Sequence, residues 1–295
     1  MAISADNAEI GSEHKETISE LLKNGSIELT SGGKVLARVK DVLPYSMSVY
    51  TPSLPGKPLD DVIDNLRLIQ AAGFNPVPHI AAKRVKSKTE LNEFLKIAVD
   101  ECGVRRVLLI GGDLDETQGP YRDAIHILEE DVLTNSGIRE VGLAGYPEGH
   151  PRITKPTLDK ALDEKIKLAT ARELGVTVVT QFSFNPSRIV DYCAFLSREY
   201  PDILVYIGMA GPTSPTTLLK YAKICGVSAS LRALSDMGFK AAQLVSHPDP
   251  KEQLEIIARY VSARDMPNVL GVHVFSFGGF VESANWMQKY SYGLK

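Results

Sequence analysis

The sequence predicts an α/β fold of the (β/α)8 type, a TIM barrel formed by one domain. From residue 26 onward, eight short β-rich runs alternate with amphipathic segments, a pattern that indicates βαβ units and a parallel sheet. The chain has 295 residues, and barrels of this type use lengths of this order as a single domain. No GxGxxG loop follows the first run and no P-loop occurs, which disfavours the alternative of an open, doubly wound sheet.

The strands of this barrel are expected at 26–30, 46–51, 75–82, 105–112, 140–146, 176–182, 203–210 and 269–275. Two helices show a clear period, because apolar residues share one face at 59–69 and at 91–98, and the second helix opens with the capping box Ser87-x-x-Glu90. An extra helix at 13–23, after a flexible segment at 1–12, is expected to plug the base of the barrel. A further helix, at 231–245, is inserted before the last strand.

The first crossover is short, because only residues 35–42 are available for its helix. An alternative is that the stretch SIELTSGGKVLARV, residues 26–39, forms a β-hairpin at the barrel floor. In that case Glu28 is merely solvated.

Composition excludes several classes of function. The net charge is −3 and the cations are spread along the chain, so we expect no nucleic-acid partner. Cys102, Cys193 and Cys225 form no CxxC pair and the six histidines lie singly, so we expect neither a disulfide framework nor a metal centre. No secretory signal and no run of about 18 apolar residues occurs, and we expect a cytoplasmic homo-oligomer without a membrane segment.

Polar residues cluster where the expected strands end, and in a barrel these ends form the active-site mouth. They are Glu28, Tyr50, Thr51, His79, Asp113 after Gly111 and Gly112, Tyr146, Glu148 and His150 in the loop GYPEGHP, and Gln181. Several have a structural alternative: His79 as a core histidine, Asp113 as a helix N-cap, and Glu148 as a solvated side chain. Tyr121, in the stretch QGPYRDA, has the alternative of anchoring the next helix. Together they favour binding of a large polar heterocycle with acid–base help and a cofactor.

Four segments, LLIGGD, AGYPEGHP, VTQFSFNPS and GPTSPTTLLKYAKICGVS, resemble the methylenetetrahydrofolate reductase family in order and spacing. The resemblance runs from about residue 26 to about residue 232. It implies a TIM barrel with FAD as cofactor and NAD(P)H as co-substrate, which interconverts 5,10-methylenetetrahydrofolate and 5-methyltetrahydrofolate in one-carbon metabolism and methionine biosynthesis. The direction, and the choice between NADH and NADPH, stay open.

The resemblance also implies residue roles. Glu28 matches the catalytic general acid toward N10 of the folate, and Asp113 and Gln181 match substrate-binding residues. Cofactor contacts are implied at Tyr50, Thr51, His79, Gly112, Asp113, Tyr121, Tyr146, His150, Asp159 and Lys165. The last two follow from counts that disagree by one residue.

The sequence departs from the family at three points. Gly111 and the pair Gly278–Gly279 stand where arginines are expected, and Leu218 stands near a glutamine position. Lys83 and Arg84, after the third strand, are the candidate substitutes for the lost charge. A second hypothesis is therefore a folate-binding or methyl-group-handling barrel without flavin-dependent reduction. A barrel lyase or aldolase is a third, but no strand ends in a clear Schiff-base lysine.

Overall fold

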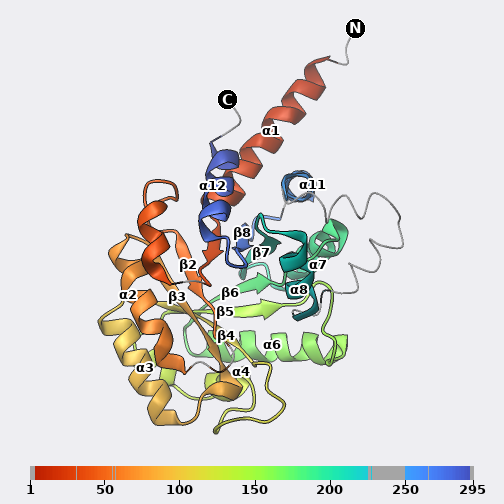
Figure 1. Ribbon diagram of the computed structural model, residues 1–295. Helices are drawn as coiled ribbons and strands as arrows, with labels where there is room; N and C mark the ends of the chain where they lie inside the picture. Colours follow the sequence, from red (N-terminus) through yellow and green to blue (C-terminus); the bar gives the residue numbers. More distant parts are fainter. Residues whose placement is uncertain are drawn as a thin grey trace.

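The computed structural model describes residues 4–30, 32–54, 56, 58–224, 227, 250–264 and 266–292. It confirms the (β/α)8 prediction: eight parallel strands pair in chain order and close into a barrel, surrounded by helices (Figure 1). All eight expected strands are present. They are β1 (Ser26–Glu28), β2 (Ser48–Thr51), β3 (Asn75–Ala81), β4 (Arg106–Ile110), β5 (Glu140–Gly145), β6 (Gly175–Thr180), β7 (Leu204–Ala210) and β8 (Val269–Phe275).

The helices fill the connections between strands. They are α1 (Ser4–Lys23), α2 (Ile63–Ala71), α3 (Lys88–Asp100), α4 (Ala124–Leu128), α5 (Val132–Asn135), α6 (Lys155–Ala171), α7 (Pro186–Glu199), α8 (Pro215–Ile224), α11 (Lys251–Arg264) and α12 (Phe280–Ser291), with 3-10 helices η1 (Gly33–Arg38), η2 (Leu59–Val62) and η3 (Ala82–Arg84). The N-cap of α3 forms as predicted, because Ser87 Oγ accepts from the Glu90 N–H at 3.0 Å. The Glu90 carboxylate accepts from the Lys86 N–H at 2.6 Å, one residue before the N-cap donor of a standard capping box. The helix expected at 231–245 lies outside the described residues.

The first crossover is a 3-10 helix, η1, and the β-hairpin alternative is wrong. Strand β1 pairs in parallel with β2 on one side and with β8 on the other, so it has no free edge for an antiparallel partner. The short segment folds as one tight helical piece that buries Leu36, and the chain after it buries Val39. Glu28 is buried, and not solvated as the hairpin alternative required.

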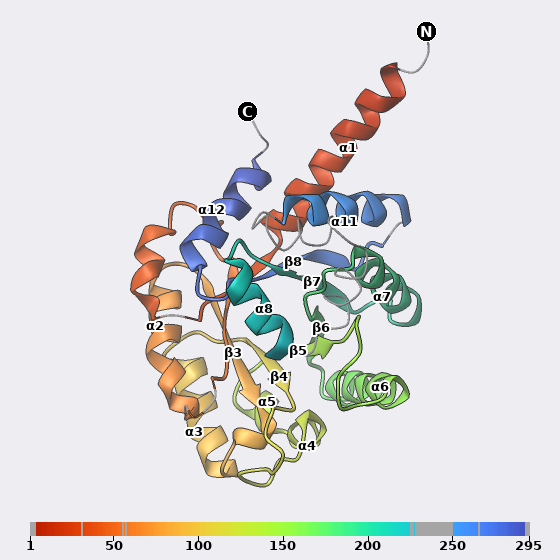
Figure 2. The ribbon, with the colours of Figure 1, turned by 45° about the vertical axis from the view of Figure 1, so that its right-hand side comes forward.

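Helix α1 starts at Ser4, earlier than expected, and packs against α11 and α12 beside the base of the barrel, with its N-terminal part projecting away (Figures 1 and 2). Its last turn buries Leu21 and Leu22. The link from α1 to β1 passes very close to β8: a Cβ on Gly271 would lie 2.8 Å from the backbone carbonyl of Asn24. None of the described helices combines the length and apolarity needed to span a membrane.

The interior of the barrel is unusually polar. Barrels of this type fill their interior mainly with branched aliphatic side chains, and here Val77, Leu108 and Val179 do so. Yet the strand registers pair Ser26 with His273 and Glu28 with Tyr50, which places polar and ionisable groups among the inward-facing positions. Further inward-facing polar residues include His79, Arg106 with its register partner Glu140, Thr177 and Tyr206.

Candidate active site at the carboxyl ends of the strands

Glu28 ends β1 and is almost enclosed, with 7% of its surface exposed. Its peptide oxygen accepts a hydrogen bond from Ser276 Oγ at 2.6 Å, which ties the end of β1 to the segment after β8. Its carboxylate oxygen Oε2 lies 3.9 Å from Nε2 of His273. The arrangement places one nearly enclosed carboxyl group at the mouth of the barrel, close to His273.

Tyr50 and His79 lie next to this carboxyl group. Tyr50 is fully buried inside the barrel, and its ring meets His79 and His273 edge to face at centroid distances of 5.9 and 4.6 Å. Burial raises the pKa of Tyr50 to about 12, against the opposing charge of Arg106. Burial also lowers the pKa of His79 to about 4, although the Glu28 carboxylate works in the other direction. Both side chains are therefore neutral at neutral pH, and Tyr50 lies below the mouth.

A cavity of about 310 Å³ opens beside these residues, between the ends of β1, β2 and β3 and the start of η2. Its lining includes Leu29, Thr51, Leu54, Asp61, Asn65 and His79. Within the described part of the chain, Thr51 Oγ1 and His79 Nε2 are buried without a hydrogen-bond partner. Buried polar atoms are normally paired, so two unpaired atoms on residues that line one cavity make this cavity the candidate ligand site.

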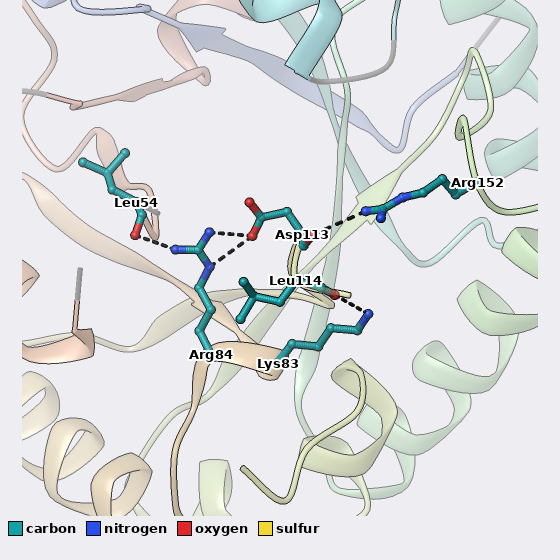
Figure 3. Close-up of polar contacts among 6 residues, drawn as sticks. All are labelled: Leu54, Lys83, Arg84, Asp113, Leu114 and Arg152. Carbon is teal, nitrogen blue, oxygen red and sulfur yellow. Dashed lines mark hydrogen bonds and ion pairs between the residues drawn. The ribbon is translucent and has the colours of Figure 1, made fainter. Parts of the chain in front are cut away.

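Asp113 follows β4 and is held by a cation from the neighbouring strand connection (Figure 3). Arg84 donates to its Oδ1 through Nε at 3.1 Å and through Nη2 at 2.5 Å, and donates to the Leu54 carbonyl at 2.6 Å through Nη1. Partial burial alone would raise the pKa of Asp113, but Arg84 and the charge of Arg152 hold that pKa below its ordinary value. Asp113 is thus an ionised hydrogen-bond acceptor at the mouth.

The N-cap alternative for Asp113 is wrong, because α4 starts at Ala124 and is capped by Asp123. Gly112 has φ +94°, a left-handed conformation that favours glycine and turns the chain after β4. The two other cations of this edge are also engaged: Lys83 Nζ donates to the Leu114 carbonyl at 2.7 Å, and Arg152 Nη1 donates to Asp115 at 2.6 Å (Figure 3 shows Lys83 and Arg152).

The loop GYPEGHP is fastened to the end of β6. The Glu148 N–H donates to Gln181 Oε1 at 3.2 Å, and Ser183 Oγ donates to the Glu148 carboxylate. Glu148, for which the sequence suggested only solvation, therefore fixes the loop and turns the carboxamide oxygen of Gln181 toward it. Tyr146 and His150 pack edge to face at 5.6 Å in the same loop.

An aromatic wall stands at the ends of β6 and β8. The ring of Phe182 packs against the rings of Phe184, Phe275 and Phe277, at centroid distances of 5.7, 5.8 and 5.2 Å. The ring of Tyr221 from α8 stacks on Phe277 at a centroid distance of 4.4 Å. Phe182 and Phe277 are buried, whereas Phe184, Phe275 and Tyr221 are partly exposed, and such partly exposed rings suit a planar, unsaturated ligand. Leu218, the residue near the expected glutamine, is buried in this cluster.

Three of the predicted cofactor contacts interact with other residues of the chain. Tyr121 is buried in the core beneath the helices and its hydroxyl donates to Glu130 at 3.0 Å, which is the anchoring role that the sequence left as an alternative. On α6, Asp159 pairs with Lys155 at 2.6 Å, whereas Lys165 lies in the field of Asp123, which caps α4. Burial lowers the pKa of Lys165.

Sequence reasoning missed His273 and its partner Ser26. The signal was present, because the run VLGVHVF alternates and a period of two places Gly271, His273 and Phe275 on one face of β8. Like His79 on β3, His273 is a histidine within an apolar strand, on the face toward the barrel axis.

The chain matches no protein-family model. Among solved structures it resembles the Ignisphaera aggregans GH53 catalytic domain, with a TM-score of 0.54 and 11% sequence identity over 93% of this chain and 97% of that chain. At this identity the likeness supports the barrel fold alone.

Proposed function

We propose that this protein is a methylenetetrahydrofolate reductase that uses FAD and NAD(P)H. The observation that carries the proposal is the enclosed carboxyl group of Glu28 at the end of β1, beside a cavity lined by Thr51 and His79, whose Oγ1 and Nε2 atoms have no partner among the described residues. These are the positions at which the resembling family has its general acid and two flavin contacts.

The residues fit FAD in part. The cavity lined by Thr51 and His79 suits the polar edge of a planar heterocycle, and bound FAD would supply hydride transfer between NAD(P)H and the folate. Arg84 brings a cation to the edge where Gly111 lacks one. Gly278 has φ +93°, a conformation unfavourable for an arginine side chain, so the second cation is absent there for a backbone reason.

The chain's own residues perform the acid–base and orienting steps. Glu28 in its protonated form holds a proton for N10 of the folate, so that the five-membered ring opens to an N5 iminium that can accept hydride. The ionised Asp113 accepts hydrogen bonds from N–H groups of the pterin, and Gln181, oriented by Glu148, contacts the folate. The aromatic wall excludes water and packs against the flat parts of the substrate.

The test is a spectrum of the purified protein, followed by the two half-reactions with Glu28→Gln. We expect flavin absorbance or a rise in thermal stability on adding FAD. The substitution should slow the folate half-reaction by roughly 100-fold or more, because removal of a general acid costs about that much. Reduction of FAD by NAD(P)H should stay intact, and Glu164→Gln, on the exposed face of α6, serves as the matched control.

A protein that shows no flavin absorbance and no response to FAD contradicts the flavin part of the proposal. Full folate turnover by Glu28→Gln contradicts the assigned acid.

The second candidate is a folate-binding or methyl-group-handling barrel without flavin reduction. It is favoured by the open space around Gly111 and Gly278 and by the engagement of Arg84 with Asp113 and Leu54. Tight binding of tetrahydrofolate together with no reduction by flavin or nicotinamide donors would select this candidate.

A further inference from the structure

His273 lies beside Glu28 in the interior of the barrel and has no exposed surface. Its Nδ1 is 2.9 Å from Ser26 Oγ. Among the residues that the structure describes, its Nε2 has no hydrogen-bond partner, and the carboxylate oxygen Oε2 of Glu28 lies 3.9 Å from it. A buried ring nitrogen without a partner costs about 1–3 kcal/mol, so this atom needs an explanation.

The ring of His273 is held on several sides. Ser26 and His273 are register partners of the neighbouring strands β1 and β8, so their side chains meet inside the barrel. Tyr50 and Phe275 each touch the imidazole edge to face, at a centroid distance of 4.6 Å in both cases. A ring packed in this way cannot turn away from Glu28, and the 3.9 Å gap closes by a movement of about 1 Å in the carboxyl group. Hydrogen bonds of catalytic groups are often this long before the substrate binds.

We infer that His273 is the positioning residue of Glu28. The Ser26 hydroxyl donates to Nδ1, which places the proton of the neutral imidazole on Nε2, and Nε2–H donates to Oε2 of Glu28 in the substrate complex. Oε1 is then the oxygen that carries the acid proton and faces the folate.

The proton transfer strengthens this contact, a consequence that rests on the proposed function. The Oε1–H bond breaks and an N–H bond forms at N10, while the electron pair of the opening C–N bond goes to N10. Glu28 is left as a carboxylate, and a hydrogen bond to an anion is about twice as strong as one between neutral groups. His273 thus stabilises the product state of the proton transfer without changing its own charge.

Two substitutions separate positioning from packing. The amide nitrogen of glutamine reaches the place of Nε2, whereas asparagine reaches only the place of Nδ1. We expect His273→Asn to slow the folate half-reaction by roughly 10–100-fold, the effect typical of residues that orient a reacting group, and His273→Gln to recover most of the rate. Reduction of FAD by NAD(P)H should be unchanged in both.

In the Glu28→Gln background, His273→Asn should add no further loss, because the two residues act as one unit. Three results would overturn the inference and leave His273 a packing residue. They are an equal loss of rate in His273→Asn and His273→Gln, a loss of rate in both half-reactions, and an additive loss when His273→Asn is combined with Glu28→Gln.

A second measurement needs neither FAD nor folate. Nitrogen-15 NMR of the histidine rings at pH 7, with the His273 signals assigned by their loss in His273→Asn, reports which nitrogen carries the proton. We expect protonation at Nε2, a mixed state in Ser26→Ala, and a shifted Nε2 signal in Glu28→Gln.

Protonation at Nδ1, with no response to Glu28→Gln, overturns the inference even when the enzyme is active. If the protein binds neither FAD nor folate, the proposed function fails, while the NMR result still decides whether Nε2 of His273 carries the proton beside Glu28.

Discussion

Replacement of His79 by glutamine tests how strongly the barrel holds this imidazole in its neutral form. His79 is 8% exposed, and burial lowers its pKa to about 4, with His273 acting in the same direction and Glu28 against it. In the unfolded chain a histidine titrates near its ordinary pKa of about 6.5. Between these two values the unfolded chain holds a proton that the folded protein does not, so folding is destabilised as the pH falls.

The size of the effect follows from the two pKa values. Linkage predicts that the titration of His79 lowers the free energy of unfolding by about 2 kcal/mol between pH 7.5 and pH 5, and by about 3 kcal/mol at pH 4. Below pH 4 the loss levels off, because both states are then protonated. The wild type loses this free energy of unfolding as the pH falls and His79→Gln does not. The difference in free energy of unfolding between the two proteins should therefore become smaller than at pH 7.5 by these amounts.

Urea unfolding of wild type and variant at pH 7.5, 6, 5 and 4 measures this difference, and other titrating groups cancel in the comparison. Tyr50→Phe is the control, since it changes a contacting ring whose hydroxyl has a pKa of about 12 and is neutral throughout. A difference between wild type and His79→Gln that stays constant within about 0.5 kcal/mol across this range would refute the reasoning.

Two further substitutions test local features of the barrel. Arg84→Met removes the hydrogen bonds to Asp113, and the pKa of that carboxyl group should rise toward its ordinary value in a carbon-13 NMR titration; an unchanged titration would show that Arg84 does not keep it low. Gly208→Ala places a Cβ 2.1 Å from the Thr180 carbonyl oxygen, so we expect a loss of roughly 3 kcal/mol in urea unfolding, whereas Gly32→Ala, whose Cβ meets no atom within 4 Å, should be nearly neutral.

The barrel was predictable because its strands are buried on both faces and therefore appear as short apolar runs, whereas its helices are buried on one face and appear as amphipathic segments. The first crossover was not, because a piece of six residues such as η1 (Gly33–Arg38) is too short to show a helical period. The early start of α1 at Ser4 had no apolar signal either, since its N-terminal part projects beyond the barrel (Figure 2).

The site was predictable where a residue's position along a strand determines its place. Glu28, His79 and Gln181 lie at the mouth because each stands at or near the carboxyl end of a strand. Asp159 and Lys165, both on α6, were placed by counting along the chain, and their role as cofactor contacts stays a prediction.

The pairing of Arg84 with Asp113 bears on the arginines that the family resemblance implies at Gly111 and Gly278–Gly279 and that this chain lacks. Position by position, Gly111 lacks a cation, yet the loop after β3 supplies one to the loop after β4 through two hydrogen bonds to a single carboxylate oxygen. A charge at the mouth depends on which strand connections lie side by side, and that is a property of the barrel order rather than of any one motif. The guanidinium of Arg84 is already engaged, because it donates to Asp113 and also to the Leu54 carbonyl. A diphosphate bound by Arg84 would compete with Asp113 for this cation, so a rise in the pKa of Asp113 on addition of FAD would show that the cation has moved to the cofactor.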